Sequence, residues 1–82
     1  MTELKEYSIV RVVKLLLAAD EYDGWRMNQR DPQIGDTGTL IDVLHAPNLP
    51  DKYVVENVRS NGRTIWLSDF FAEEIEPIDP ST

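Results

Sequence analysis

The chain has no cysteine, one histidine and only four glycines among its 82 residues. Without cysteine it has no disulfide, no thiolate metal site and no redox pair. The single histidine, His45, cannot form a histidine cluster. We therefore expect a domain stabilised by its hydrophobic core, with no metal and no other cofactor, in a reducing compartment such as the cytoplasm.

Long apolar runs are also missing. The most apolar stretch, residues 9–19, is interrupted by Arg11 and Lys14, and the N-terminus carries mixed charge, so we expect neither a signal peptide nor a membrane span. Basic residues are few: eight stand against fifteen acidic ones, giving a net charge of −7. This charge repels phosphates and anionic lipids, so neither nucleic acid nor a membrane is an expected partner.

The length and composition predict one domain. With 82 residues and 41% hydrophobic content, residues 1–82 form a single unit with its core at about 7–78. A chain of this size buries only roughly 60–65% of its unfolded surface. Its margin of stability is therefore small, and the chain has no room for a second core.

Strand and turn signals run along most of the chain. Residues 7–17 are rich in β-branched side chains, and further strand patterns cover residues 40–44, 53–58, 64–68 and 75–78. A long irregular loop, 20–33, follows the first strand, and residues 15–19 alone could be helical. Gly35-Asp36 and Gly38 mark a tight turn, and 45–52 is a surface loop. Residues 72–74 form one helical turn, with Asp69 as its N-cap.

The best-defined predicted hairpin has Asn61-Gly62 at its tip, a pair typical of a two-residue type I′ turn. That turn places Val58 opposite Ile65, and it also pairs Asn57 with Trp66 and Glu56 with Leu67. Both faces of the hairpin are then apolar. One face must be core, and the other is covered by the long loop or offered to a partner.

The order of these elements resembles a Src-homology-3-like (SH3-like) barrel over about Ile9 to Ile78. Four segments are similar to those of a family of small, uncharacterised bacterial barrel proteins: Gly35-Asp36-Thr37-Gly38-Thr39-Leu40, Pro47-Asn48-Leu49-Pro50, Tyr53-Val54-Val55-Glu56 and Glu73-Glu74-Ile75-Glu76-Pro77-Ile78. The chain also resembles, more loosely, accessory barrels such as the variable chain of ferredoxin-thioredoxin reductase. The resemblance implies an all-β fold with five strands, and a non-catalytic subunit or adaptor. Eukaryotic members of this fold that bind proline-rich peptides carry an Ala-Leu-Tyr-Asp-Tyr run before the long loop. This chain lacks that run, so a proline-rich ligand is not expected.

We predict that the domain binds a protein partner through an aromatic patch and catalyses nothing. Aromatic residues and methionine are enriched where protein surfaces meet. The predicted patch combines loop and hairpin residues: Tyr22, Trp25, Met27, Tyr53 and Trp66. The alternative is that the long loop covers the aromatic face. A barrel with two apolar faces is also a candidate for homodimerisation.

Two further functions remain open. The acidic run at the C-terminal end is expected to be a solvated turn and edge strand, and it would suit an immunity-type antagonist of a basic toxin; its residues are Asp69, Glu73, Glu74 and Glu76. A small enzyme would be centred on Glu56 or His45, although no glycine-flanked serine elbow accompanies them. The run Asp20–Gly24 lacks the acid spacing and the glycine position of a calcium loop.

Overall fold

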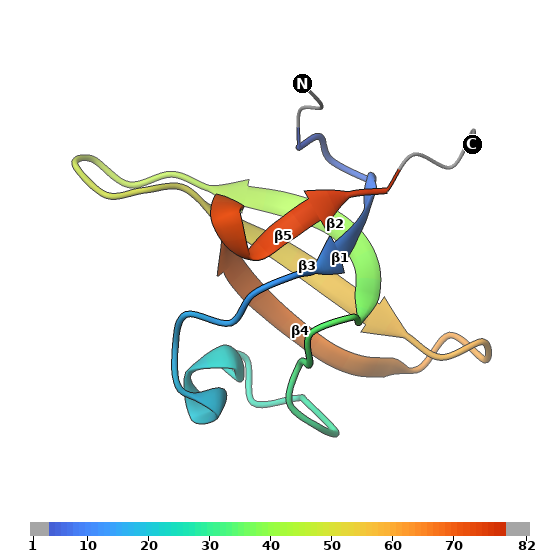
Figure 1. Cartoon of the computed structure of the whole chain (residues 1–82). Coiled ribbons are helices and arrows are strands. Elements are labelled where there is room, and N and C mark those ends of the chain that lie inside the picture. Colours follow the sequence, from blue (N-terminus) through green and yellow to red (C-terminus); the bar gives the residue numbers. More distant parts are fainter. Residues whose placement is uncertain (1–3, 79–82) are drawn as a thin grey trace.

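The computed structural model describes residues 4–78, which form one curved antiparallel sheet and two short 3-10 turns, η1 (Ala19–Tyr22) and η2 (Ala72–Glu74) (Figure 1). The predicted fold class is confirmed: the domain is all-β, with five strands, a long loop after the first and one helical turn before the last. The strands are β1 (Ile9–Val12), β2 (Thr37–Leu44), β3 (Lys52–Val58), β4 (Thr64–Phe71) and β5 (Ile75–Pro77).

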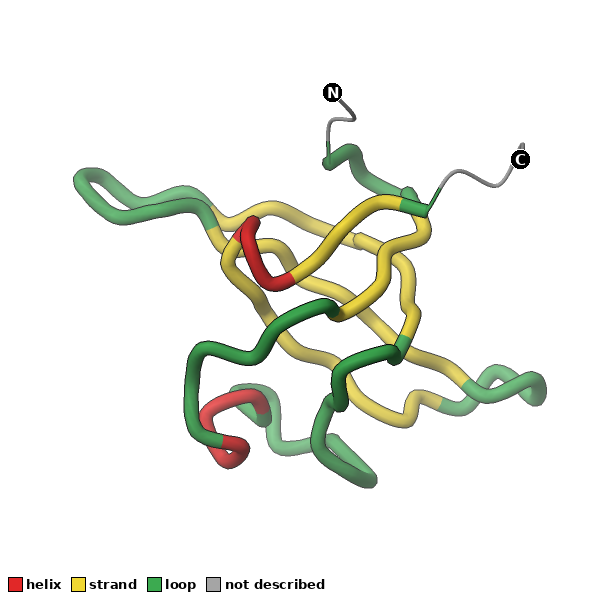
Figure 2. The backbone as a smooth tube through the Cα atoms, in the orientation of Figure 1, coloured by secondary structure: helices red, strands yellow, loops and turns green. Residues whose placement is uncertain are grey.

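The sheet has the strand order β4-β3-β2-β1-β5, with every neighbouring pair antiparallel. Strand β2 is shared: its first residues pair with β1, and the stretch from Thr39 onward pairs with β3. The register shifts between Leu40 and Asp42, which leaves Ile41 as an extra residue. Such a bulge bends its strand, and Figure 2 shows β2 curving around the molecule so that the sheet folds over one core.

The core lies on the concave side of this sheet. Alternate residues of β4, from Trp66 to Phe70, point inward and are fully buried, and Val10, Val12 and Leu40 meet them from β1 and β2. The Trp66 and Phe70 rings meet edge to face, with centroids 5.6 Å apart. Tyr22 reaches this core from η1 and packs on Phe70 at 5.5 Å. The long loop therefore contributes one aromatic side chain to the core.

The tip of the β3–β4 hairpin differs from the predicted type I′ turn. Only Gly62 has a positive φ there, 86°, and its N–H bonds the Arg59 carbonyl, while the Arg59 N–H bonds the Arg63 carbonyl. This is a three-residue loop closed by a left-handed glycine. The register at Asn57–Trp66 and Glu56–Leu67 is as predicted, but Val58 pairs with Thr64 instead of Ile65, because the longer loop leaves an irregularity there.

The end of the chain also differs in detail. Strand β4 continues to Phe71 instead of ending at Ser68, and Asp69 lies inside it, so Asp69 is not the N-cap of η2. The turn begins after Phe71, whose N–H donates to the Glu74 carboxylate at 2.8 Å. A glutamate at the third position of the turn reaches back to the cap residue, which is half of a capping box. The first helical turn of the long loop likewise covers Ala19–Tyr22, not 15–19.

Candidate functional site

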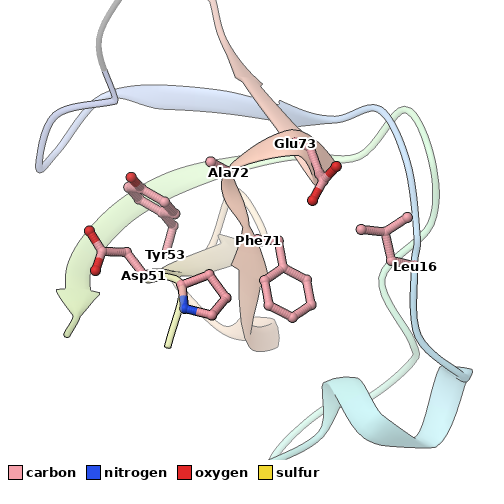
Figure 3. Close-up of a pocket in the computed structure, with 7 residues that line it drawn as sticks. Leu16, Asp51, Tyr53, Phe71, Ala72 and Glu73 are labelled. Atoms are coloured by element: carbon pink, nitrogen blue, oxygen red, sulfur yellow. The ribbon is translucent and has the colours of Figure 1, made fainter. Parts of the chain in front are cut away.

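The described surface has an open pocket of about 420 Å³. Its lining comes from three places far apart in the sequence: the segment after β1, the β2–β3 loop with the start of β3, and the β4–η2 junction. Figure 3 shows Phe71 between Tyr53 and Leu16, with the carboxyl groups of Asp51 and Glu73 on opposite sides. The lining residues are Leu16, Pro50, Asp51, Tyr53, Phe71, Ala72 and Glu73.

The position of Phe71 in this pocket follows from strand alternation. In β4 the side chains of Phe70 and Phe71 must point to opposite faces. Phe70 is fully buried in the core, and Phe71 is half-buried at the pocket. Tyr53 pairs with Phe70 across the ladder and therefore lies on the core face, where it packs half-buried against the core and also reaches the pocket. Leu16 completes the apolar lining with 47% of its surface exposed.

Charged side chains border the pocket. Asp51 pairs with His45, whose Nδ1 lies 2.8 Å from the carboxylate. Lys52 is already engaged, because its Nζ lies 3.7 Å from the Asp69 carboxylate and 4.0 Å from the centre of the Phe71 ring. Glu73 is exposed and has no ion pair among the described contacts. The rim of the pocket is therefore mainly acidic.

The five residues predicted as a partner-binding patch do not form one surface. Tyr22 and Trp66 are 1% and 0% exposed, so the prediction that they meet a partner is wrong. The hairpin face that carries Val55 and Trp66 is the core, because the sheet curves toward it. Trp25 and Met27 are exposed at 45% and 46% and do not line the pocket. Of the predicted patch, only Tyr53 lies in it.

Asp36 fixes the return of the long loop to the sheet. Its carboxylate accepts the Trp66 indole N–H at 2.9 Å, two bonds from Arg30 at 2.7 and 3.1 Å, and the Gln33 N–H at 3.0 Å. Burial opposes ionisation, but the bonds from Arg30, Gln33 and Trp66 outweigh it and lower the pKa of Asp36 below its usual range. Arg30 in turn forms its ion pair with Asp36.

Glu74 lies inside the molecule. It was predicted to be part of a solvated acidic turn, and this is wrong: Glu74 is 0% exposed, so it is not available to an acidic docking surface. Its Oε2 accepts the Leu16 N–H at 2.9 Å and the Tyr22 hydroxyl, and its Oε1 accepts the Phe71 N–H. Burial, reinforced by the bond to Glu74, raises the pKa of Tyr22, so the phenol stays protonated and donates.

The two residues suggested for an enzyme lie apart from this cluster. Glu56 is half-buried and accepts a hydrogen bond from the Thr64 hydroxyl at 2.6 Å, not an ion pair from Arg11, Lys14 or Arg63. His45 is exposed at the β2–β3 loop. Ser68, one of the serines it would need, is buried and donates to the Tyr22 carbonyl. Within residues 4–78 no three histidine or acidic side chains are grouped as metal ligands would be.

Sequence reasoning missed most of the pocket lining for a physical reason. The pair Phe70-Phe71 carried the signal, since two adjacent aromatics in a strand cannot both be core, but ending the strand at Ser68 concealed it. Pro50 and Asp51 were assigned only to a surface loop. Leu16 comes from a segment whose path depends on the Glu74 carboxylate. Only contacts between distant segments bring these side chains together.

No family model, no curated protein and no solved structure matches this chain. In the part of the chain that the structure describes, no helix has the length and apolar character needed to cross a membrane.

Proposed function

We propose that this domain is a non-catalytic, SH3-like protein-binding or accessory module whose docking site is the pocket around Tyr53 and Phe71. One observation carries the proposal: an apolar lining remains open beside a core that is otherwise closed. Leu16, Tyr53 and Phe71 line the pocket together and keep part of their surface exposed, whereas the core aromatics Trp66 and Phe70 are fully buried. Exposed apolar surface that the fold does not need for its own core is typical of binding sites.

The strand order and the position of η2 support the SH3-like part of the proposal. Strands β1, β2 and β5 form one half of the curved sheet, and β2, β3 and β4 form the other. The helical turn η2 joins the last strand of one half to the last strand of the other. Five strands with one helical turn before the last are what the sequence resemblance implies, and this agreement supports the proposal.

The charge around the pocket selects the kind of partner. We assign it a peptide segment that inserts an apolar side chain between Leu16, Tyr53 and Phe71 and places a lysine or arginine beside Glu73. The acidic rim and the net charge of −7 favour a basic partner segment and repel an acidic one. The apolar contact supplies most of the affinity, and the rim charge supplies orientation.

A random peptide library displayed on phage tests this function. Selection on the purified domain should enrich peptides that combine apolar residues with at least one basic residue. Binding of the selected peptide should be lost in Tyr53→Ala and kept in Trp25→Ala, which changes an exposed aromatic outside the pocket. Glu73→Gln should weaken binding and reduce its salt dependence. Glu76→Gln, which changes the second residue of β5 outside the pocket, should do neither.

Two results would overturn the proposal. If no peptide is enriched, the pocket does not act as a peptide-docking site. If Trp25→Ala abolishes binding while Tyr53→Ala keeps it, the partner contacts the loop surface instead of the pocket.

A further inference from the structure

We propose that Glu74 is the positioning residue of the pocket, holding its two apolar walls at a fixed distance through one buried carboxylate. This inference rests on the proposed docking function of the pocket. Glu74 itself does not line the pocket. It acts through Leu16 and Phe71.

Each carboxylate oxygen holds one wall. Oε1 accepts the backbone N–H of Phe71 at 2.8 Å, and Oε2 accepts the backbone N–H of Leu16 at 2.9 Å. These are the residues whose side chains face each other across the pocket, as Figure 3 shows. The two residues are 55 positions apart in the sequence, and no strand pairing joins their segments directly.

The Tyr22 hydroxyl extends the hold on the Leu16 wall. It donates to Oε2 of Glu74 and accepts the Leu17 N–H at 3.0 Å. The Tyr22 ring is fixed by its packing on Phe70 in the core. Residues 16 and 17 are therefore tied to the core through a side chain of the long loop, and the Phe71 wall has no share in that tie.

The backbone of Glu74 adds a second connection on the same side. Its carbonyl accepts the N–H groups of Val13 and Lys14 at 2.8 and 3.2 Å, where the chain leaves β1. This connection remains when the Glu74 side chain is changed. The loss of the carboxylate should therefore release Leu16 and Phe71 without detaching the start of the segment.

The chemistry explains why a carboxylate is used. Leu16 N–H, Phe71 N–H and Tyr22 O–H are three donors that converge on one buried place, and an ionised carboxylate accepts from all of them and donates to none. Glutamine has the same shape but only one acceptor oxygen, so its amide group faces a donor. Glutamine thus loses the bond to one wall and weakens the bond to the other, because its remaining oxygen carries no charge.

Amide hydrogen exchange measured by NMR tests the hold without any partner. Compared with wild type, Glu74→Gln should exchange faster at both Leu16 and Phe71, on the order of tenfold or more, while amides of β3 stay protected. Tyr22→Phe should speed exchange at Leu17, whose N–H loses its acceptor, and leave Phe71 unchanged. Glu76→Gln, an exposed carboxylate that pairs with Arg11, is the matched control and should change neither wall.

The binding arm uses the peptide selected on the wild-type domain. Glu74→Gln should weaken its binding by about tenfold, equivalent to about 1.4 kcal/mol, and Tyr22→Phe should weaken it less. Wild-type exchange at Leu16 and Phe71 in a folded Glu74→Gln variant would overturn the inference. Faster exchange at Leu16 and Phe71 together with unchanged peptide affinity would overturn the positioning role, while the docking function of the pocket would stand.

The experiment still gives a result if Glu74→Gln does not fold or if no peptide is selected. If Glu74→Gln does not fold, Glu74→Asp takes its place, because its carboxylate is one methylene shorter and should release Leu16, Phe71 or both; wild-type exchange at both amides would then overturn the inference. If no peptide is selected, the docking function fails, and the exchange data still decide whether Glu74 holds the two walls.

Discussion

At the scale of single residues, two carboxylates join the long loop to the sheet. Asp36 bonds the Trp66 indole at one place, and Glu74 bonds Tyr22 and the backbone of Leu16 at another. Buried or half-buried charges are costly unless they are hydrogen-bonded, and each of these has at least three donors. The loop is thereby held by specific polar contacts in addition to the Tyr22 ring.

Trp66→Ala should destabilise the domain severely. The indole is fully buried, packs edge to face on Phe70 and donates to Asp36. Removing a buried tryptophan costs about 3–5 kcal/mol, which is a large part of the stability of so small a domain. Thermal and urea denaturation followed by circular dichroism measures the loss.

Trp25→Ala is the matched control for that experiment, since Trp25 is 45% exposed. It should change the free energy of unfolding by less than about 1 kcal/mol. Similar losses in the two variants would show that Trp66 is not the core residue that its burial indicates.

Asp36 should make stability depend on pH in the acid range. Its pKa is lowered in the folded state, so its bonds stabilise the fold at pH values above the ordinary aspartate range, about pH 4. That contribution is lost as the pH falls through the lowered pKa, because protonation then accompanies unfolding. Chemical denaturation at several pH values should show a smaller acid loss in Asp36→Asn than in wild type.

The same variant should be less stable near neutral pH by about 1–3 kcal/mol, since it removes the charge that pairs with Arg30 and leaves one acceptor oxygen in place of two. Equal acid sensitivity in Asp36→Asn and wild type would contradict this role. Arg30→Gln separates the arginine contribution from that of the indole.

At the scale of the elements, the start of β2 lies close to β3, and Gly38 permits the approach. A Cβ at this position would lie 2.7 Å from the Glu56 carbonyl oxygen and 2.7 Å from Cγ1 of Val55. Gly38 was expected to be part of a tight turn; it lies instead within β2, opposite Val10. Its lack of a side chain serves strand packing.

Gly38→Ala should therefore destabilise the domain by about 1–3 kcal/mol, as overpacking does. The clash is with backbone, which cannot move aside without shifting the β2–β3 ladder. Gly24→Ala is a suitable control, because nothing lies within 4 Å of its added Cβ. Equal midpoints of urea unfolding for the two variants would contradict the close approach.

At the scale of the whole molecule, we expect the domain to be a monomer at low and at high salt. The aromatic side of the hairpin, which made a homodimer conceivable, carries Trp66 and is turned into the core. A net charge of −7 also repels a second copy at low salt. Size exclusion coupled to light scattering should give the mass of one chain at both ionic strengths.

A stable dimer would contradict this expectation and would direct attention to the remaining exposed apolar side chains. Tyr53→Ala and Val58→Ala would then distinguish the pocket from the end of the β3–β4 hairpin as the self-interface. Dissociation by the first change alone would mean that the pocket is occupied by a second copy.

The local pattern of the sequence was sufficient for the type and order of the strands, but not for their exact bounds. β-branched runs and alternation predicted the strands, and Gly62 with its neighbours predicted a hairpin with the register of Asn57–Trp66 and Glu56–Leu67. These features depend on backbone preferences and on the period of two in a strand. They need no knowledge of distant contacts.

The tertiary structure alone decided which side chains face inward and what the polar ones do. Both faces of the hairpin are apolar, so the direction in which the sheet curves, set in part by the bulge at Ile41, determines that Trp66 is core and Phe71 is available. Glu74 follows the same logic: in sequence it is one acid among several. It becomes a buried anchor because Leu16, Tyr22 and Phe71 bring three donors to it from distant parts of the chain.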